Sequence, residues 1–176
     1  MKTIKILLIL AILGLITASA VIYSGIFPIA ADEPHGKFTY WVLEQARERA
    51  IARSAKDIEV PALDSPDLLL SGGADYNDMC SSCHLKPGQS ESDLSLGLYP
   101  KPPNLSLANH DDNHTHDDKD LQSKKWYWVI KHGIKASGMP AWGTTHDDDR
   151  IWAMVAFLQK MPNLTEDQYQ VITARN

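Results

Sequence analysis

The most apolar stretch of the chain is its amino-terminal segment, residues 1–31. Lys2 and Lys5 precede an apolar run from Ile6 to Ala31 that is broken only by small or weakly polar residues. About 20 apolar residues are enough for a helix that spans a membrane, and lysines in front of such a helix hold its amino terminus in the cytoplasm. The pattern therefore predicts an uncleaved membrane anchor.

A secretory signal is the alternative interpretation of this segment. Its apolar region would be Ile6–Ile16, and cleavage would follow Ala18-Ser19-Ala20. The apolar run, however, continues beyond that point through Val21-Ile22-Tyr23 to Ile26-Phe27. A plain signal has no need of an apolar tail on the mature protein, so we favour the anchor.

Residues 32–65 show a weak helical periodicity, which predicts an amphipathic spacer helix over roughly residues 39–56, ended before Pro61. The apolar face of this helix consists of Val42, Leu43, Ala46 and Ala50. We expect this face to pack on the domain that follows. A second interpretation gives Arg47, Arg49 and Arg53 contacts with lipid headgroups or with a partner complex.

Two clearer helices follow the spacer. One begins at Pro66, which suits the first turn of a helix, with Ser65 as its cap. The other covers residues 119–132 and ends before Gly133. Its predicted buried side is Leu121, Trp126, Val129 and Ile130.

A last long helix begins with Asp147-Asp148-Asp149, whose charges complement the helix dipole, and ends at Met161-Pro162. Its apolar residues recur at helical spacing: Ile151, Trp152, Val155, Ala156, Phe157 and Leu158. Thr165 to Gln168 then form a capping box for a short final turn. The whole pattern is that of a mostly α chain.

The charge balance limits the partners of this chain. The 176 residues carry a formal net charge of −5, and all 22 acidic residues follow residue 31. Only two of the 17 basic residues precede that point, so the remainder has 15 basic against 22 acidic residues, a net charge of −7. An acidic surface argues against nucleic-acid binding and favours a protein partner with a basic docking surface.

Cys80-Ser81-Ser82-Cys83-His84 is the strongest chemical signal in the chain. Two cysteines with two residues between them, followed at once by histidine, form the attachment motif for haem c. At the end of a helix the two thiols reach two vinyl groups on one edge of the porphyrin, and the imidazole projects toward the iron. We expect thioether bonds at Cys80 and Cys83, His84 as proximal iron ligand, and one covalent haem.

Two alternatives to haem attachment fit the motif less well. A thioredoxin-like redox dithiol expects a βαβ context, which the sequence does not show. A zinc site needs two further ligands at short spacing, and the chain has no third cysteine.

The residues around the motif resemble a class I (mono-haem) cytochrome c of the membrane-anchored bacterial type, over roughly residues 66–162. Gly72, Tyr76 and Cys80 share one helical face; in that family the glycine lets the first helix cross the last closely, and the aromatic residue packs into the crossing. Gly73 leaves this register open by one residue. The resemblance implies helices packed around one covalently attached haem c, here preceded by a transmembrane helix and the amphipathic spacer. It also places the haem domain in the periplasm.

The same resemblance assigns three further residues. Pro103, in Pro102-Pro103-Asn104-Leu105, matches the turn whose carbonyl accepts the proximal imidazole N–H; an ordinary proline turn is the alternative. Met139, in Gly138-Met139-Pro140, matches the segment that supplies the distal iron ligand. Trp142 matches a haem-packing position, although it also suits an ordinary core residue. The rivals to Met139 are His132, in a bis-histidine arrangement, and Met79, Met154 and Met161.

The segment from His110 to His116 is the least family-like part of the chain. It holds three histidines, and aspartates surround them. Such a loop could bind copper or zinc, or it could be a solvated acidic loop that docks a basic partner.

These patterns predict four parts: a membrane anchor or signal (1–31), a spacer (32–65), a cytochrome c domain (66–162) and a carboxy-terminal tail (163–176). We expect a one-electron carrier or an electron-relay subunit, not an enzyme with a small-molecule substrate, because two axial ligands leave the iron no open site. A copper- or redox-responsive haem protein that uses the His110–His116 loop is the alternative.

Overall fold

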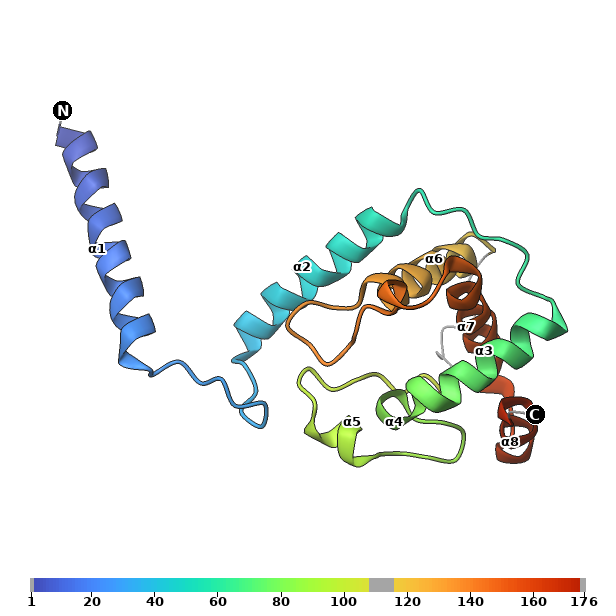
Figure 1. The fold of residues 1–176 in the computed structure, drawn as a ribbon. Coiled ribbons are helices and arrows are strands. Elements are labelled where there is room, and N and C mark those ends of the chain that lie inside the picture. The colour runs from blue at the N-terminus through green and yellow to red at the C-terminus, as the bar shows by residue number, and fades with distance from the viewer. Residues whose placement is uncertain (1, 108–115, 175–176) are drawn as a thin grey trace. The chain divides into compact units, whose positions relative to one another are not determined.

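The computed structural model describes residues 2–107 and 116–174, and only the backbone of residues 116–118. This part of the chain is helical and contains no strand, which confirms the mostly α prediction. It divides into two units, Met1–Pro34 and His35–Asn176, which we treat separately. The elements (Figure 1) are α1 (Lys2–Ser24), α2 (Lys37–Ala55), α3 (Pro66–Met79), α4 (Ser81–His84), α5 (Asp93–Gly97), α6 (His116–His132), η1 (Trp142–Thr144), α7 (Asp148–Lys160), η2 (Met161–Asn163) and α8 (Glu166–Thr173).

The first unit consists of α1 and the segment that follows it. With 23 residues, α1 is about 34 Å long at 1.5 Å per residue, which is enough to cross the roughly 30 Å hydrocarbon core of a membrane. Within the described residues it is the one helix long and apolar enough to do so. It ends at Ser24, before Gly25 at φ +65°, so the helix is shorter than the apolar run that extends to Ala31. An α1 of this length and composition fits a single-pass membrane anchor.

The second unit is built on the crossing of α3 and α7 (Figure 1). A Cβ atom on Gly72 would overlap the backbone carbonyl of Ala153 and lie 2.9 Å from the backbone nitrogen of Met154. Gly73 faces side chains instead, with the ring of Phe157 at 3.0 Å. Gly72 is therefore the residue at the closest approach of the two helices, which resolves the register left open by the sequence.

The core of this unit lies along α7, where every residue from Ile151 to Leu158 is buried. Tyr76 of α3 packs against it, with its ring centroid 5.4 Å from that of Phe157. Tyr169 of α8 meets Tyr76 edge-on at 6.5 Å and also lies 5.9 Å from the Phe157 ring. Three helices thus share one aromatic cluster beneath the Cys80–His84 segment.

Of the two predicted caps, the box at Thr165 is present and the cap by Ser65 is not formed, while Asp147 forms a cap that was not predicted. The Asp147 side chain accepts a hydrogen bond from the N–H of Arg150 at the start of α7. Thr165 and Gln168 form the predicted capping box of α8. Ser65 stands at the predicted position before Pro66, but its hydroxyl makes no capping bond.

The predicted buried side of α6 is partly wrong. Leu121 is 40% exposed, whereas Ser123 and Tyr127 are buried together with Ile130. The Ser123 hydroxyl accepts a hydrogen bond from the amide of Gln159 on α7, and Tyr127 stacks on Trp152 at 4.2 Å. The buried side of α6 is therefore the side that contacts α7, and it includes polar and aromatic residues as well as aliphatic ones.

The predicted apolar face of the spacer helix is wrong. Val42, Leu43, Ala46 and Ala50 are all exposed on α2. The buried residues are Ile51 and Ala55, and the helix packs on α6 through its opposite side. The stripe includes Val42 and Leu43, so apolar area alone does not decide which side packs; Ile51 and Ala55 are buried because their side of α2 faces the rest of the domain.

Candidate functional site

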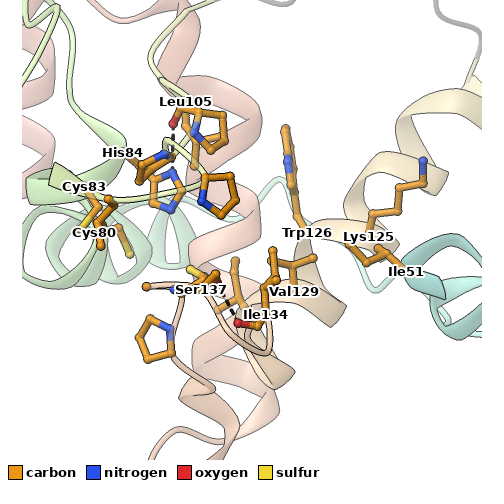
Figure 2. Close-up of a pocket in the computed structure, with 18 of the residues that line it drawn as sticks. Ile51, Cys80, Cys83, His84, Leu105, Lys125, Trp126, Val129, Ile134 and Ser137 are labelled. Atoms are coloured by element: carbon orange, nitrogen blue, oxygen red, sulfur yellow. Dashed lines mark hydrogen bonds between the residues drawn. The ribbon is translucent and has the colours of Figure 1, made fainter. Parts of the chain in front are cut away.

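The second unit encloses a largely apolar cavity of about 520 Å³, within the roughly 300–1,000 Å³ range of ligand pockets. Figure 2 shows Cys80 and Cys83 on one side of it, His84 beside them, and Trp126, Lys125 and Ile51 on the other side. The residues singled out in the sequence all line this one cavity: Cys80, Cys83, His84, Pro103, Met139 and Trp142.

The junction of α3 and α4 positions the cysteines. Cys80 ends α3 with its N–H bonded to the Tyr76 carbonyl, and its own carbonyl accepts from the N–H groups of Cys83 and His84 at 3.1 and 2.8 Å. This single turn places three reactive side chains at the cavity edge. Burial, helped by the nearby Asp75 carboxylate, raises the pKa of the Cys80 thiol to about 12. The Cys80 thiol is therefore protonated at neutral pH in the haem-free chain.

His84 is held from two directions. Its Nδ1 lies 3.0 Å from the carbonyl oxygen of Pro103. Because that oxygen can only accept, Nδ1 carries the proton and Nε2 keeps a lone pair free for a metal. The Tyr76 hydroxyl donates to the Leu85 carbonyl at 2.6 Å and lies 3.2 Å from the His84 carbonyl. Burial lowers the pKa of His84, which favours the neutral, ligating form of the ring.

Met139 lies in a tight turn on another wall of the cavity. The Ser137 hydroxyl donates to the Ile134 carbonyl at 2.7 Å (Figure 2) and accepts from the Met139 N–H at 3.1 Å. The Ile134 N–H donates to the Met139 carbonyl at 3.2 Å. Gly133, at φ +65°, brings the end of α6 so close to this turn that a Cβ there would lie 2.7 Å from the Met139 carbonyl oxygen. The turn is thereby locked to the end of α6.

The rivals to Met139 occupy different places. His132 lines a second, shallower pocket and packs its ring against Trp128 at 5.0 Å, so it is not among the residues around the main cavity. Met79 and Met154 do line the main cavity, but both belong to long helices, α3 and α7. Met161 belongs to the core beneath.

Five cavity residues come from α2 and were not predicted as site residues: Tyr40, Glu44, Arg47, Glu48 and Ile51. The helical periodicity marked the opposite face of this helix. No local signal in the sequence shows that polar residues of a spacer face a cavity.

The His110–His116 loop, interpreted from the sequence as either a metal site or a solvated acidic loop, lies mostly outside the described residues. His110 and His114 lie outside the described residues, as does the side chain of His116. Elsewhere in the described chain there is no group of three or more His, Cys, Asp or Glu side chains that could hold a metal ion.

The cavity fits a haem. Two thiols stand at one edge, an imidazole with a free Nε2 projects beside them, and the remaining lining is largely apolar. A helical domain with a Cys-x-x-Cys-His turn at such a cavity defines the class: a mono-haem class I cytochrome c. Residues 67–158, more than half of the chain, match the family described as cytochrome c oxidase, cbb3-type, subunit III, and the chain belongs to this family. Comparison with curated proteins and with solved structures gave no match.

Family membership confirms three sequence predictions. The protein carries covalently bound haem c, it is an electron-transfer protein, and it exchanges electrons with redox partners.

Proposed function

We propose that the protein is a one-electron carrier or electron-relay subunit with haem c attached at Cys80 and Cys83 and ligated by His84 and Met139. The haem supplies reversible one-electron chemistry at its iron. The observation that carries the proposal is the convergence of four donors, two thiols, one imidazole and one thioether, on one cavity. Pro103 orients the imidazole through Nδ1, and Trp142 lines the cavity beside Met139.

This donor set favours electron transfer over substrate chemistry. With His84 and Met139 both bound, no axial position remains for a substrate, and a methionine ligand raises the reduction potential. The two ligands should keep their positions when the iron is reduced, because the turn of Met139 is held by Ser137 and by the end of α6.

Visible spectra of the full-length haem protein test the ligand assignment. The oxidised wild type should show the methionine-to-iron charge-transfer band, and Met139→Ala should lose it. Met79→Leu, which changes another methionine at the same cavity, should keep it. Absence of the band from the wild type, or its loss only in Met79→Leu, would exclude Met139.

We further propose that α1 is retained as a single-pass anchor and holds the haem domain in the periplasm. The support is the continuous helix from Lys2 to Ser24, which runs through the alternative cleavage point at Ala20. The mass of the purified protein distinguishes the two forms, because cleavage would remove residues 1–20. Retention of these residues, with resistance to alkaline extraction from membranes, is the expected result.

The acidic surplus supports a redox partner with a basic docking surface. Complementary charge chiefly accelerates association, and salt screens it. The rate of electron transfer to the partner should therefore fall as ionic strength rises. A rate that increases with salt would instead indicate an acidic partner.

A further inference from the structure

Helix α2 forms one wall of the haem cavity. It precedes the region that matches the family, which begins at residue 67, yet Tyr40, Glu44, Arg47, Glu48 and Ile51 all line the cavity. Three of these five residues are charged, in a cavity whose other walls are mostly apolar. Arg47 is the one cation among these five residues, and a ligand carboxylate at this wall would give its guanidinium a further charge-assisted hydrogen bond beside those to Glu44 and Glu48.

Both ends of α2 are fastened to the rest of the domain. Before the helix, the His35 N–H donates to the Tyr99 hydroxyl at 3.0 Å, and the two rings meet edge-on. After it, the Lys124 ammonium donates to the Lys56 carbonyl at 3.4 Å. Ile51 is buried between these ends. The wall is therefore a fixed part of the cavity and not a loosely attached spacer.

The wall lies opposite the attachment edge. In Figure 2, Ile51 and Lys125 lie across the cavity from Cys80 and Cys83. Arg47 precedes Ile51 by one helical turn and so lies on the same face of α2. In haem c the two thioether-forming groups and the two propionates leave opposite edges of the porphyrin. Attachment at Cys80 and Cys83 therefore directs the propionates toward this wall.

The guanidinium of Arg47 is oriented by two neighbouring carboxylates. Its Nε donates to Glu48 Oε1 at 3.2 Å, and its Nη2 lies 3.2 Å from the same oxygen and 3.8 Å from Glu44 Oε1. A guanidinium has five N–H donors in a planar fork, so the Nη1 hydrogens remain to bind a further carboxylate. A carboxylate that accepts from Nη1 would form a charge-assisted hydrogen bond, which is stronger than a neutral one.

We propose that Arg47 binds a haem propionate and that α2 covers the propionate edge of the haem. The inference rests on the attachment at Cys80 and Cys83 proposed above. Lys101 and Lys125 also line the cavity and add positive charge toward the two propionates. A cation held near the haem favours addition of an electron, so Arg47 raises the reduction potential.

Redox titration of the full-length haem protein tests this role. Arg47→Gln should shift the reduction potential downward, and Arg47→Lys should restore much of it, because the lysine keeps the charge without the fork. Arg49→Gln is the matched control: it removes the same charge from an exposed position two residues away. Its potential should stay near that of the wild type. An unchanged potential in Arg47→Gln, or an equal shift in Arg49→Gln, overturns the proposal.

A second readout serves if Arg47→Gln fails to fold. In resonance Raman spectra the propionate bending frequency should differ between the wild type and Arg47→Lys; identical frequencies overturn the proposal. The mass of the chain is measured first. A chain without covalently bound haem contradicts the attachment at Cys80 and Cys83, whereas attached haem with unaltered potential and Raman frequency contradicts only the role of Arg47.

Discussion

Arg150 and Asp75 join α7 to α3 through two nearly parallel hydrogen bonds. Arg150 Nε lies 2.6 Å from Asp75 Oδ2, and Arg150 Nη2 lies 2.8 Å from Asp75 Oδ1. Asp75 is buried, with 5% of its surface exposed, and it lies one turn before the attachment segment. The pair thus ties the helix that carries Cys80 to the start of the core helix.

Arg150→Gln should destabilise the protein by about 1–3 kcal/mol, because it removes the guanidinium, which is itself partly exposed, from a buried carboxylate. Denaturation in guanidinium chloride, followed by circular dichroism, measures the loss. Arg49→Gln removes an exposed arginine and should change the free energy of unfolding by less than about 0.5 kcal/mol. Similar losses of free energy of unfolding in both variants would show that the Arg150–Asp75 pair does not stabilise the fold.

Gly72→Ala should be the more harmful of the two glycine substitutions in α3. The new Cβ would overlap the backbone carbonyl of Ala153, which cannot move without shifting α7, so we expect a loss of about 1–3 kcal/mol. Gly73→Ala meets the Phe157 ring and the Ile172 side chain at 3.0–3.2 Å, and these can adjust. Urea denaturation of the two variants provides the comparison. A larger loss in Gly73→Ala would reverse the assignment of the helix crossing.

Asp148 gives the stability a modest dependence on pH. The Lys131 ammonium, 2.6 Å away, and then the Tyr127 hydroxyl lower the pKa of this carboxyl group. A lowered pKa stabilises the folded state above the unfolded pKa, and this contribution is lost as pH falls through the folded value. The pair is well exposed, so solvent screening limits its effect to at most about 1 kcal/mol.

Asp148→Asn should therefore be slightly less stable than the wild type at pH 7 and equally stable near pH 2. Urea denaturation across this range gives the difference at each pH. Asp149→Asn, one residue along the same first turn of α7, serves as control and should show a smaller difference. If the difference in stability between Asp148→Asn and the wild type stays the same at low pH, the charge of the Asp148 carboxylate does not cause it.

Ser137→Ala should weaken the hold on the turn of Met139. It removes the bonds to the Ile134 carbonyl and from the Met139 N–H, each worth roughly 0.5–1.5 kcal/mol. If Met139 is the distal ligand, imidazole should bind the oxidised variant about tenfold more tightly, since 1.4 kcal/mol corresponds to a factor of ten. Spectrophotometric titration measures the affinity.

Thr144→Ala is the control for Ser137→Ala. It removes a similar hydroxyl bond, from Thr144 to the Ala141 carbonyl at 2.9 Å, in the short helix η1 that begins at Trp142. It should leave the imidazole affinity unchanged. Equal affinities in the wild type and Ser137→Ala would show that this hydroxyl does not support the turn.

Features that depend on neighbouring residues could be predicted from the sequence. The capping box at Thr165, the helix end at Gly133 and the attachment turn at Cys80 each need only a few consecutive residues, whose chemistry is visible in order. Which glycine of α3 lies at the helix crossing could not be predicted from neighbouring residues. Only the backbone of α7 distinguishes Gly72 from Gly73.

Contacts between distant residues could not be predicted in this way. Asp75 and Arg150 are 75 residues apart, and no periodicity links them. The face of α2 was predicted wrongly for a related reason. Periodicity assumes that apolar residues turn inward, but on α2 Glu44 and Arg47 line the cavity while Val42 faces out.

The position of α2 affects how the domain can be shortened. A chain that begins at Ser65 would keep the entire family-matched region and both cysteines, but it would lose the wall from Tyr40 to Ile51. If α2 covers the propionate edge of the haem as proposed, water and small oxidants would reach that edge in the shortened chain. Solvent exposure alters the reduction potential of a haem, so a soluble fragment cut at the family boundary would be a different redox reagent from the protein it came from.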